Sequence, residues 1–134
     1  MYSEILSAIK AVALTYASPF TAIVNGTMPE ENGLAIFIAS GAETKAFFKG
    51  GTYEISIVLN GKHSNLQTLI NTLSTIHINL SGMNFINTTS FYGDLWQIIK
   101  ISTSSAPTYI DKEVSSNQWI YGSSLRIEFY YKGA

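Results

Sequence analysis

Residues 115–134 read SSNQWIYGSSLRIEFYYKGA, and this stretch decides the fold. From residue 124 onward, apolar and polar side chains alternate, which is the period of a β-strand with one buried face. The apolar face carries Leu125, Ile127, Phe129 and Tyr131, and the opposite face carries Arg126, Glu128 and Tyr130. The sequence therefore predicts a C-terminal strand that packs an aromatic face against a core.

Four upstream segments also have the composition of strands. Residues 20–24 and 92–103 predict strands from their β-forming side chains, and the segment 52–63 predicts another strand, which ends at Asn60-Gly61. Residues 33–40 are apolar on both faces, which favours an internal strand with helices on one side and another layer on the other.

Two connections are less regular. Residues 79–87 are either a connection or a short strand. Residues 104–118 are predicted to form a long loop, because Pro107 restricts the backbone and the apolar residues there have no sustained period.

Two helices are expected. The first is capped by Ser3 and ends before Pro19, with apolar residues at steps of three and four. The second runs from about Asn65 to Ile76 behind a capping box formed by Ser64 and Gln67, and it has one apolar stripe.

The predicted order is therefore helix, three strands, helix and two strands. Turns rather than helices join most of the strands, which favours antiparallel pairing. We expect one α+β domain over residues 1–134, a two-layer sandwich in which a mainly antiparallel sheet carries both helices on one face.

Composition excludes several classes of protein. The chain has no cysteine, which removes disulfides, thiolate zinc sites and cysteine nucleophiles and fits folding in a reducing cytoplasm. Charged residues make up 13% and the net charge is −1, with Lys and Arg scattered, so no sequence-specific nucleic-acid binding is expected. The N-terminus predicts an amphipathic helix rather than a signal peptide, and no apolar run has the roughly twenty residues of a membrane span.

No catalytic or metal-binding pattern is present. His63 and His77 lack metal-ligand spacing and are predicted to be exposed histidines flanking the second helix. No nucleophile elbow, phosphate-binding glycine loop or dinucleotide fingerprint occurs, and the nine carboxylates give no basis for choosing a catalytic pair. We expect no enzyme activity, no catalytic or metal site and no cofactor.

Large aromatic and apolar residues are the remaining candidates for function. They lie in predicted loops or on the polar strand face, where an isolated domain normally has polar residues, and they are Phe47, Phe48, Tyr109, Ile110, Trp119 and Tyr130. Each could instead fold back onto the core of its own domain. Tyr and Trp are favoured at interfaces, and the surface has few charges, so the sequence predicts a component of an assembly.

Three segments resemble small bacteriophage proteins of the head–tail junction, namely the minor capsid and tail-terminator families of siphophages and myophages. The segments are SNLQTLINTL at 64–73, STSSAPTYIDKE at 102–113 and WIYGSSLRIEFYYKG at 119–133. The resemblance in length, element order and aromatic last strand covers nearly the whole chain. It implies a two-layer α+β subunit that closes into a ring, often of six copies, on the end of the tail tube and stops its polymerisation.

The resemblance also implies the partners and the location. The partners are copies of the chain itself, the tail tube protein, head-connector or neck proteins, and the tail sheath if the tail is contractile. The location is the neck of a virion assembled in the cytoplasm of a bacterial host, or of a phage-derived bacteriocin-like particle. A tail-completion or minor capsid protein, and a small cytoplasmic module that binds a ligand or peptide, remain open as alternatives.

Overall fold

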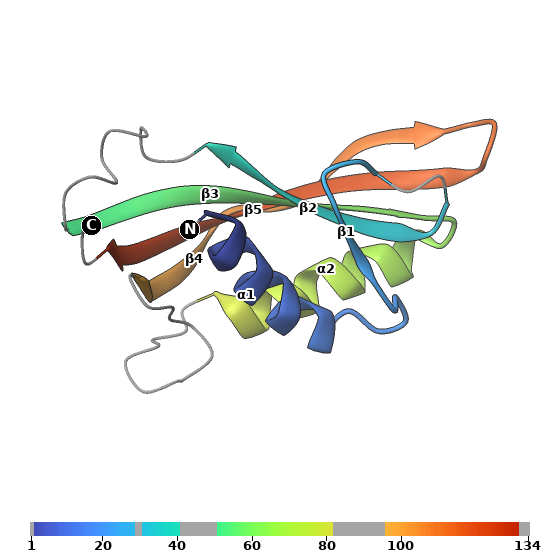
Figure 1. The fold of residues 1–134 in the computed structure, drawn as a ribbon. Helices are drawn as coiled ribbons and strands as arrows, with labels where there is room; N and C mark the ends of the chain where they lie inside the picture. The colour runs from blue at the N-terminus through green and yellow to red at the C-terminus, as the bar shows by residue number, and fades with distance from the viewer. Residues whose placement is uncertain (1, 29–30, 41–50, 82–95, 132–134) are drawn as a thin grey trace.

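A computed structural model of the chain describes residues 2–28, 31–40, 51–81 and 96–131. Its elements are, in order, α1 (Tyr2–Thr15), β1 (Ile23–Asn25), β2 (Gly33–Ser40), β3 (Gly51–His63), α2 (Leu66–Leu80), β4 (Trp96–Glu113) and β5 (Gln118–Tyr131). This is the order predicted from the sequence. The fold is α+β, and both helices pack against the same face of one sheet (Figure 1).

The sheet has the strand order β1-β2-β3-β5-β4. All neighbours pair antiparallel except β1 with β2, which are parallel. β5 therefore lies between β3 and β4, and its pairing with β3 runs from Gly51↔Tyr131 to His63↔Trp119 without a register shift. The C-terminal strand is thus an internal strand of the sheet.

The core lies between the sheet and the two helices. The predicted apolar face of β5 is buried, since Leu125, Ile127 and Phe129 have no exposed surface. Ile55, Ile57 and Leu59 of β3 lie in the same layer of the core as the β5 residues. The helices contribute Ile5, Ile9 and Ala13 from α1 and Leu69, Leu73, Ile76 and Leu80 from α2, all fully buried.

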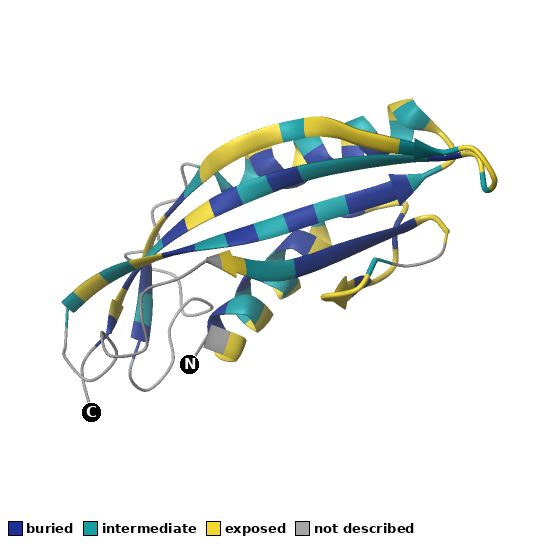
Figure 2. Cartoon of the chain, turned by 90° about the horizontal axis from the view of Figure 1, so that it is seen from above, coloured by how far each residue is buried: buried dark blue, intermediate teal, exposed yellow. Residues whose placement is uncertain are grey.

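The other face of the sheet carries no helix among the described residues. Seen from above, the strands alternate between buried and more exposed residues, and β4 is mostly exposed (Figure 2). We call this surface the open face. The prediction that a second layer would cover residues 33–40 on this side is not met by any described residue, although Ala35 on that face of β2 is nearly fully buried.

The prediction of a loop over residues 104–118 is wrong, because most of that segment is the second half of β4. Its pairing with β5 contains four register shifts, and one of them, between Ser105 and Thr108, absorbs Pro107. These bulges interrupt the alternation of side chains, so no strand period is visible in the sequence. The resulting β4–β5 hairpin reaches past the ends of the other strands (Figure 1).

The ends of β3 and α2 also differ from the predictions. β3 continues through Asn60-Gly61 to His63, because Gly61 lies in the strand beneath α2 and does not form a turn. The N-cap of α2 is Asn65, whose side chain accepts from the backbone N–H of Thr68 at 3.1 Å, so the predicted capping box is absent. α2 extends to Leu80 and includes His77.

Candidate functional site

Three aromatic side chains gather on the helix-side face of the projecting hairpin. Tyr109 of β4 lies 6.3 Å from Trp119 and 6.0 Å from Tyr121 of β5, centroid to centroid, with both ring pairs close to edge-to-face. The amino group of Lys112 lies 4.4 Å from the centre of the Trp119 ring. Tyr109 remains 52% exposed, so the group presents aromatic surface to solvent.

His63 continues this aromatic group across the sheet. It pairs with Trp119 in the β3–β5 register, which places the two side chains on the same face. The His63 ring in turn lies 5.4 Å from the ring of Phe20, in an edge-to-face arrangement. Tyr109, Trp119, Tyr121, His63 and Phe20 therefore form one strip of rings, which we call the aromatic strip.

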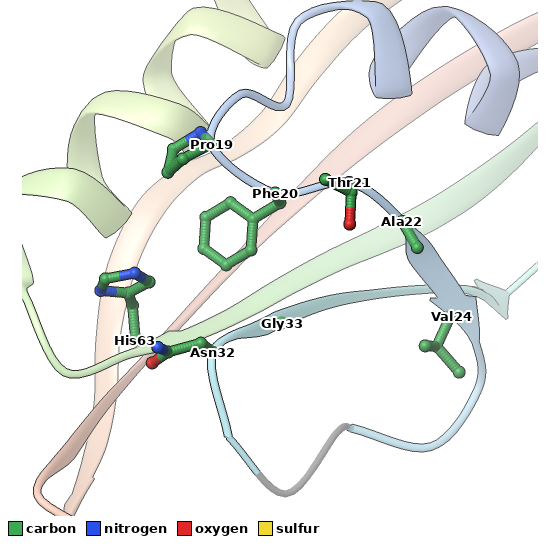
Figure 3. Close-up of a pocket in the computed structure, with 8 residues that line it drawn as sticks. All are labelled: Pro19, Phe20, Thr21, Ala22, Val24, Asn32, Gly33 and His63. Atoms are coloured by element: carbon green, nitrogen blue, oxygen red, sulfur yellow. The ribbon is translucent and has the colours of Figure 1, made fainter.

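A cavity of about 310 Å³ opens at the Phe20 end of the aromatic strip. Figure 3 shows the rings of Phe20 and His63 beside one another, with Asn32 near them and Val24 on the far side of the cavity. Pro19, Thr21, Ala22 and Gly33 complete the lining. The walls are therefore partly apolar and partly polar, and the side chains of His63, Asn32 and Thr21 can form hydrogen bonds.

An ion pair holds the hairpin to the body of the sheet from the open face. Lys62 of β3, which is 5% exposed, places its amino group 2.6 Å from a carboxylate oxygen of Glu113 in β4. The Lys62 hydrogen bond, and a second one from Ser116, hold the pKa of Glu113 below its usual value. The pair spans β5, so it braces the outer half of the hairpin.

The open face is mixed in character. Glu54 and Glu128 are direct neighbours across β3 and β5. Arg126 lies 3.8 Å from the Glu54 carboxylate, and this exposed ion pair contributes little to stability. Tyr130 is 42% exposed on this face. Ile110 is 53% exposed, and its side chain lies over Gly122, where a Cβ atom would come within 2.6 Å of it.

His77 is buried in α2, contrary to the prediction of an exposed histidine. It is 5% exposed, and its Nδ1 lies 3.0 Å from the hydroxyl of Thr103 in β4. Its Nε2 makes no hydrogen bond to any residue that the structure describes. Burial lowers the pKa of His77 below the usual value of 6.5, so the ring is neutral in the folded protein at pH 7.

A second hollow, of about 440 Å³, lies between the two helices. It is lined by uncharged polar side chains together with an aromatic and a proline: Thr15, Tyr16, Ser18, Pro19, Thr68, Asn71, Thr72 and Thr75. Among the described residues that line it, the Tyr16 phenol is the one titratable group. The hollow therefore has no acid–base pair with which to carry out a reaction.

The predicted site residues fall in different places. Tyr109 and Trp119 lie together in the aromatic strip, while Ile110 and Tyr130 lie on the open face. Trp119 is half-buried and packs partly on the core. Phe47 and Phe48 lie outside the described residues, and the interface role of all six stays a prediction.

The sequence reasoning missed Tyr121, His63 and Phe20 as members of this surface. Tyr121 could have been found, because it continues the odd-numbered apolar face of β5 from Leu125 toward the hairpin. His63 and Phe20 gave no signal, since the strand carrying His63 was predicted to end before it and Phe20 comes from a distant segment.

Within the residues that the structure describes, no three His, Asp or Glu side chains come together in a way that could hold a metal ion. No helix in the same part of the chain is both long and apolar enough to span a bilayer. The described surface offers aromatic contacts, an exposed strand and two hollows of mixed polarity.

Comparison with known proteins gives a match in structure only. No family model matches the sequence, and no curated protein matches it either. Among solved structures, the fold is similar to a chain from the "Virion of native gene transfer agent (GTA) particle", with a TM-score of 0.51 and 10% sequence identity. The similarity covers 96% of this chain and 90% of that one. At this identity the match shows a shared fold over almost the whole length.

Proposed function

We propose that this chain is a structural protein of a phage or phage-derived particle, and specifically a tail-terminator subunit of the head–tail junction. In this role it forms a ring on the end of the tail tube and stops tube polymerisation. The observation that carries the proposal is the fold shared over 96% of the chain with a component of a gene transfer agent virion. The resemblance of three sequence segments to phage junction proteins supports the same assignment.

The exposed edge of the sheet supports an assembly role. β4 is 18 residues long, and among the described strands it pairs with β5 alone. Lys100 is the one charged residue between Trp96 and Ile110, so little charge blocks the outer edge, although the four bulges make it irregular. A neighbouring chain can therefore add to parts of this edge through backbone hydrogen bonds.

The exposed apolar groups support a ring with two different contact surfaces. A closed ring needs a heterologous interface, in which two distinct surfaces of each subunit meet. Here the aromatic strip lies on the helix side of the sheet, whereas Ile110 and Tyr130 are exposed on the open face. Each subunit thus carries apolar groups on both faces of its sheet.

The partners follow from this role. The chain contacts further copies of itself in a ring, for which six copies are expected, as well as the tail tube protein and the head-connector proteins. In a contractile tail it also contacts the sheath. With a net charge of −1, these contacts depend on shape and apolar surface more than on charge attraction.

Deletion of the gene from a strain that produces the particle tests the assignment. Without a terminator, tube polymerisation has no stop, so we expect headless tails of variable and excessive length in negative-stain micrographs. Restoring the gene in trans should restore a uniform length. Deletion mutants with normal, uniform and head-joined tails would contradict any essential junction role.

The same experiment separates a second assignment within the particle. The shared fold supports a tail-completion or minor capsid protein as well as a terminator, and loss of such a part leaves tails of normal length that fail to join heads. A ligand-binding module outside any particle is favoured only by the cavities, and its loss leaves particles unchanged.

The mass of the purified chain gives a second readout. A ring of six has a mass of about six times 14.7 kDa in light scattering, or about 88 kDa. Because some rings form only on the tube, the measurement is made on the chain mixed with purified tail tubes. Phe48→Ser should reduce ring formation there if Phe47-Phe48 is part of the interface, with Tyr130→Ser as a comparison.

A further inference from the structure

The aromatic strip and the cavity at its end form one continuous surface. Tyr109 and Tyr121 contact at 6.0 Å, Tyr109 and Trp119 at 6.3 Å, and Trp119 is next to His63 in register. His63 contacts Phe20, which lines the cavity. The strip therefore runs from the outer strand β4 across β5 and β3 to the segment before β1.

Two hydrogen-bond donors at the cavity, on His63 and Asn32, have no partner among the described residues. The Nδ1 atom of His63 accepts the backbone N–H of Asn65 at 2.8 Å, so in the neutral ring the proton is on Nε2. The side-chain oxygen of Asn32 accepts the backbone N–H of Ser64 at 3.1 Å, which leaves its NH₂ group as a donor. Neither donor group makes a hydrogen bond to any part of the chain that the structure describes.

The local backbone holds these two side chains in place. The backbone N–H of Asn32 donates to the side-chain oxygen of Gln118, which is 3% exposed, at 2.9 Å. Asn32 has a positive φ of 34°, a conformation that Asn tolerates better than most residues. Contacts among three segments that are distant in sequence therefore fix the positions of these donors.

The charge of this surface limits what it can bind. Lys112 is already engaged with the Trp119 ring, and Glu113 is engaged with Lys62. The Asp111 carboxylate accepts the backbone N–H of Lys112 at 2.8 Å. Lys112 is therefore the one basic side chain shown to contact the strip, and the described surface lacks the basic groove that single-stranded nucleic acid needs.

We propose that the aromatic strip and its cavity bind an extended, uncharged, proline-containing segment of a partner chain. Proline-rich segments in the polyproline II conformation dock on aromatic-lined grooves, and their carbonyl groups are free to accept hydrogen bonds. Proline rings pack against Tyr109 and Trp119, and backbone carbonyls accept from His63 Nε2–H and the Asn32 amide. This inference does not depend on the ring assignment; it gives the aromatic strip to a different partner and leaves the β4 edge and the open face, with Ile110 and Tyr130, for contacts between subunits.

The test uses the full chain, labelled with ¹⁵N, and a capped decaproline peptide. We expect saturable shifts of the indole N–H signal of Trp119, while that of Trp96 stays unchanged because Trp96 is buried and bonded to Glu4. A capped Gly-Ser decapeptide of the same length should cause no saturable shift. Circular dichroism confirms that each variant below retains the fold.

Three variants locate the binding. Tyr109→Ser removes an exposed ring and should raise the Kd at least tenfold. His63→Phe retains a ring beside Phe20 but removes the donor, and should raise the Kd about threefold to tenfold. Tyr130→Ser, which removes a comparably exposed ring from the open face, should leave the Kd unchanged.

Several results would overturn the proposal. They are the absence of a saturable shift with decaproline, equal binding of the Gly-Ser peptide, and an effect of Tyr130→Ser as large as that of Tyr109→Ser. If the Trp119 signal shifts with protein concentration alone and Tyr109→Ser abolishes this, the occupant is a second copy, and the proposal is wrong. None of these outcomes bears on tail length in the deletion strain, so the two proposals fail separately.

Discussion

Gly61→Ala tests how closely α2 packs on the sheet. A Cβ atom at position 61 would lie 2.5 Å from Leu69 Cδ1 and 3.0 Å from Leu34 Cδ2. Both leucines are fully buried, so neither side chain can move into solvent. The added methyl group therefore has to displace α2 or force a strained rotamer.

The expected loss of stability follows from two opposing terms. Overpacking of a core by one methyl group costs about 1–3 kcal/mol. Replacing Gly by Ala within a strand returns about 0.5–1 kcal/mol, because the unfolded chain loses less conformational freedom. We expect the free energy of unfolding of Gly61→Ala to fall by about 1–2 kcal/mol.

Gly122→Ala is the matched control, one residue along on the neighbouring strand and on the opposite face. Its Cβ atom would meet Ile110 Cδ1 at 2.6 Å and the Asn60 side-chain oxygen at 2.8 Å. Ile110 is 53% exposed, so its end can swing into solvent. We expect the stability of this variant to stay within about 0.5 kcal/mol of wild type.

Urea denaturation followed by far-UV circular dichroism measures both variants. The double variant Gly61→Ala/Leu69→Ala adds a second check, because the new methyl group partly fills the cavity left at Leu69. Its loss should be smaller than the sum of the single losses by more than about 0.5 kcal/mol. Equal destabilisation by the two glycine changes, or an additive double variant, would refute the packing argument.

Three further predictions concern the core and the last strand. The free energy of unfolding should fall as the pH drops below about 6.5 and level off below the lowered pKa of His77, because the unfolded chain takes up the proton first. Urea titrations at pH 8 and pH 5 should show a smaller loss of stability at pH 5 in His77→Gln than in the wild type, and an equal loss would exclude His77 as its source. Glu4→Ala should lower the free energy of unfolding by about 1 kcal/mol, because it removes the carboxylate that accepts the Trp96 indole N–H at 2.5 Å. Glu4→Gln keeps an acceptor and should lose less stability, and equal losses in thermal melts would argue against that hydrogen bond. Truncation after Gly122 should abolish soluble folding, because β5 lies between β3 and β4, and a soluble, cooperatively unfolding fragment would contradict the strand order.

The sequence by itself determined the elements that a regular period marks. The alternation from Leu125 to Tyr131 predicted the buried face of β5, and the stripe from Leu66 to Ile76 predicted α2. Binary patterns of this kind depend only on which face of one element is apolar, so one chain segment contains all the information. The element order and the α+β class followed from them.

The tertiary structure alone decided where the strands pair and which rings meet. β4 forms over residues that lack a strand period because β5 supplies hydrogen-bond partners along its length, and bulges absorb Pro107. His77 is buried because α2 continues one turn further and packs against β4 at Thr103. Neither fact has a local sequence signal.

The candidate site shows the same division. The sequence singled out Tyr109 and Trp119 as aromatic residues in unusual positions, but it placed them in a loop and treated them separately. Their contact depends on the β4–β5 register, and the addition of His63 and Phe20 depends on strand neighbours and on a segment more than forty residues away. Contacts between distant segments arise from the packing of the whole sheet, which is why a period read along one segment does not reveal them.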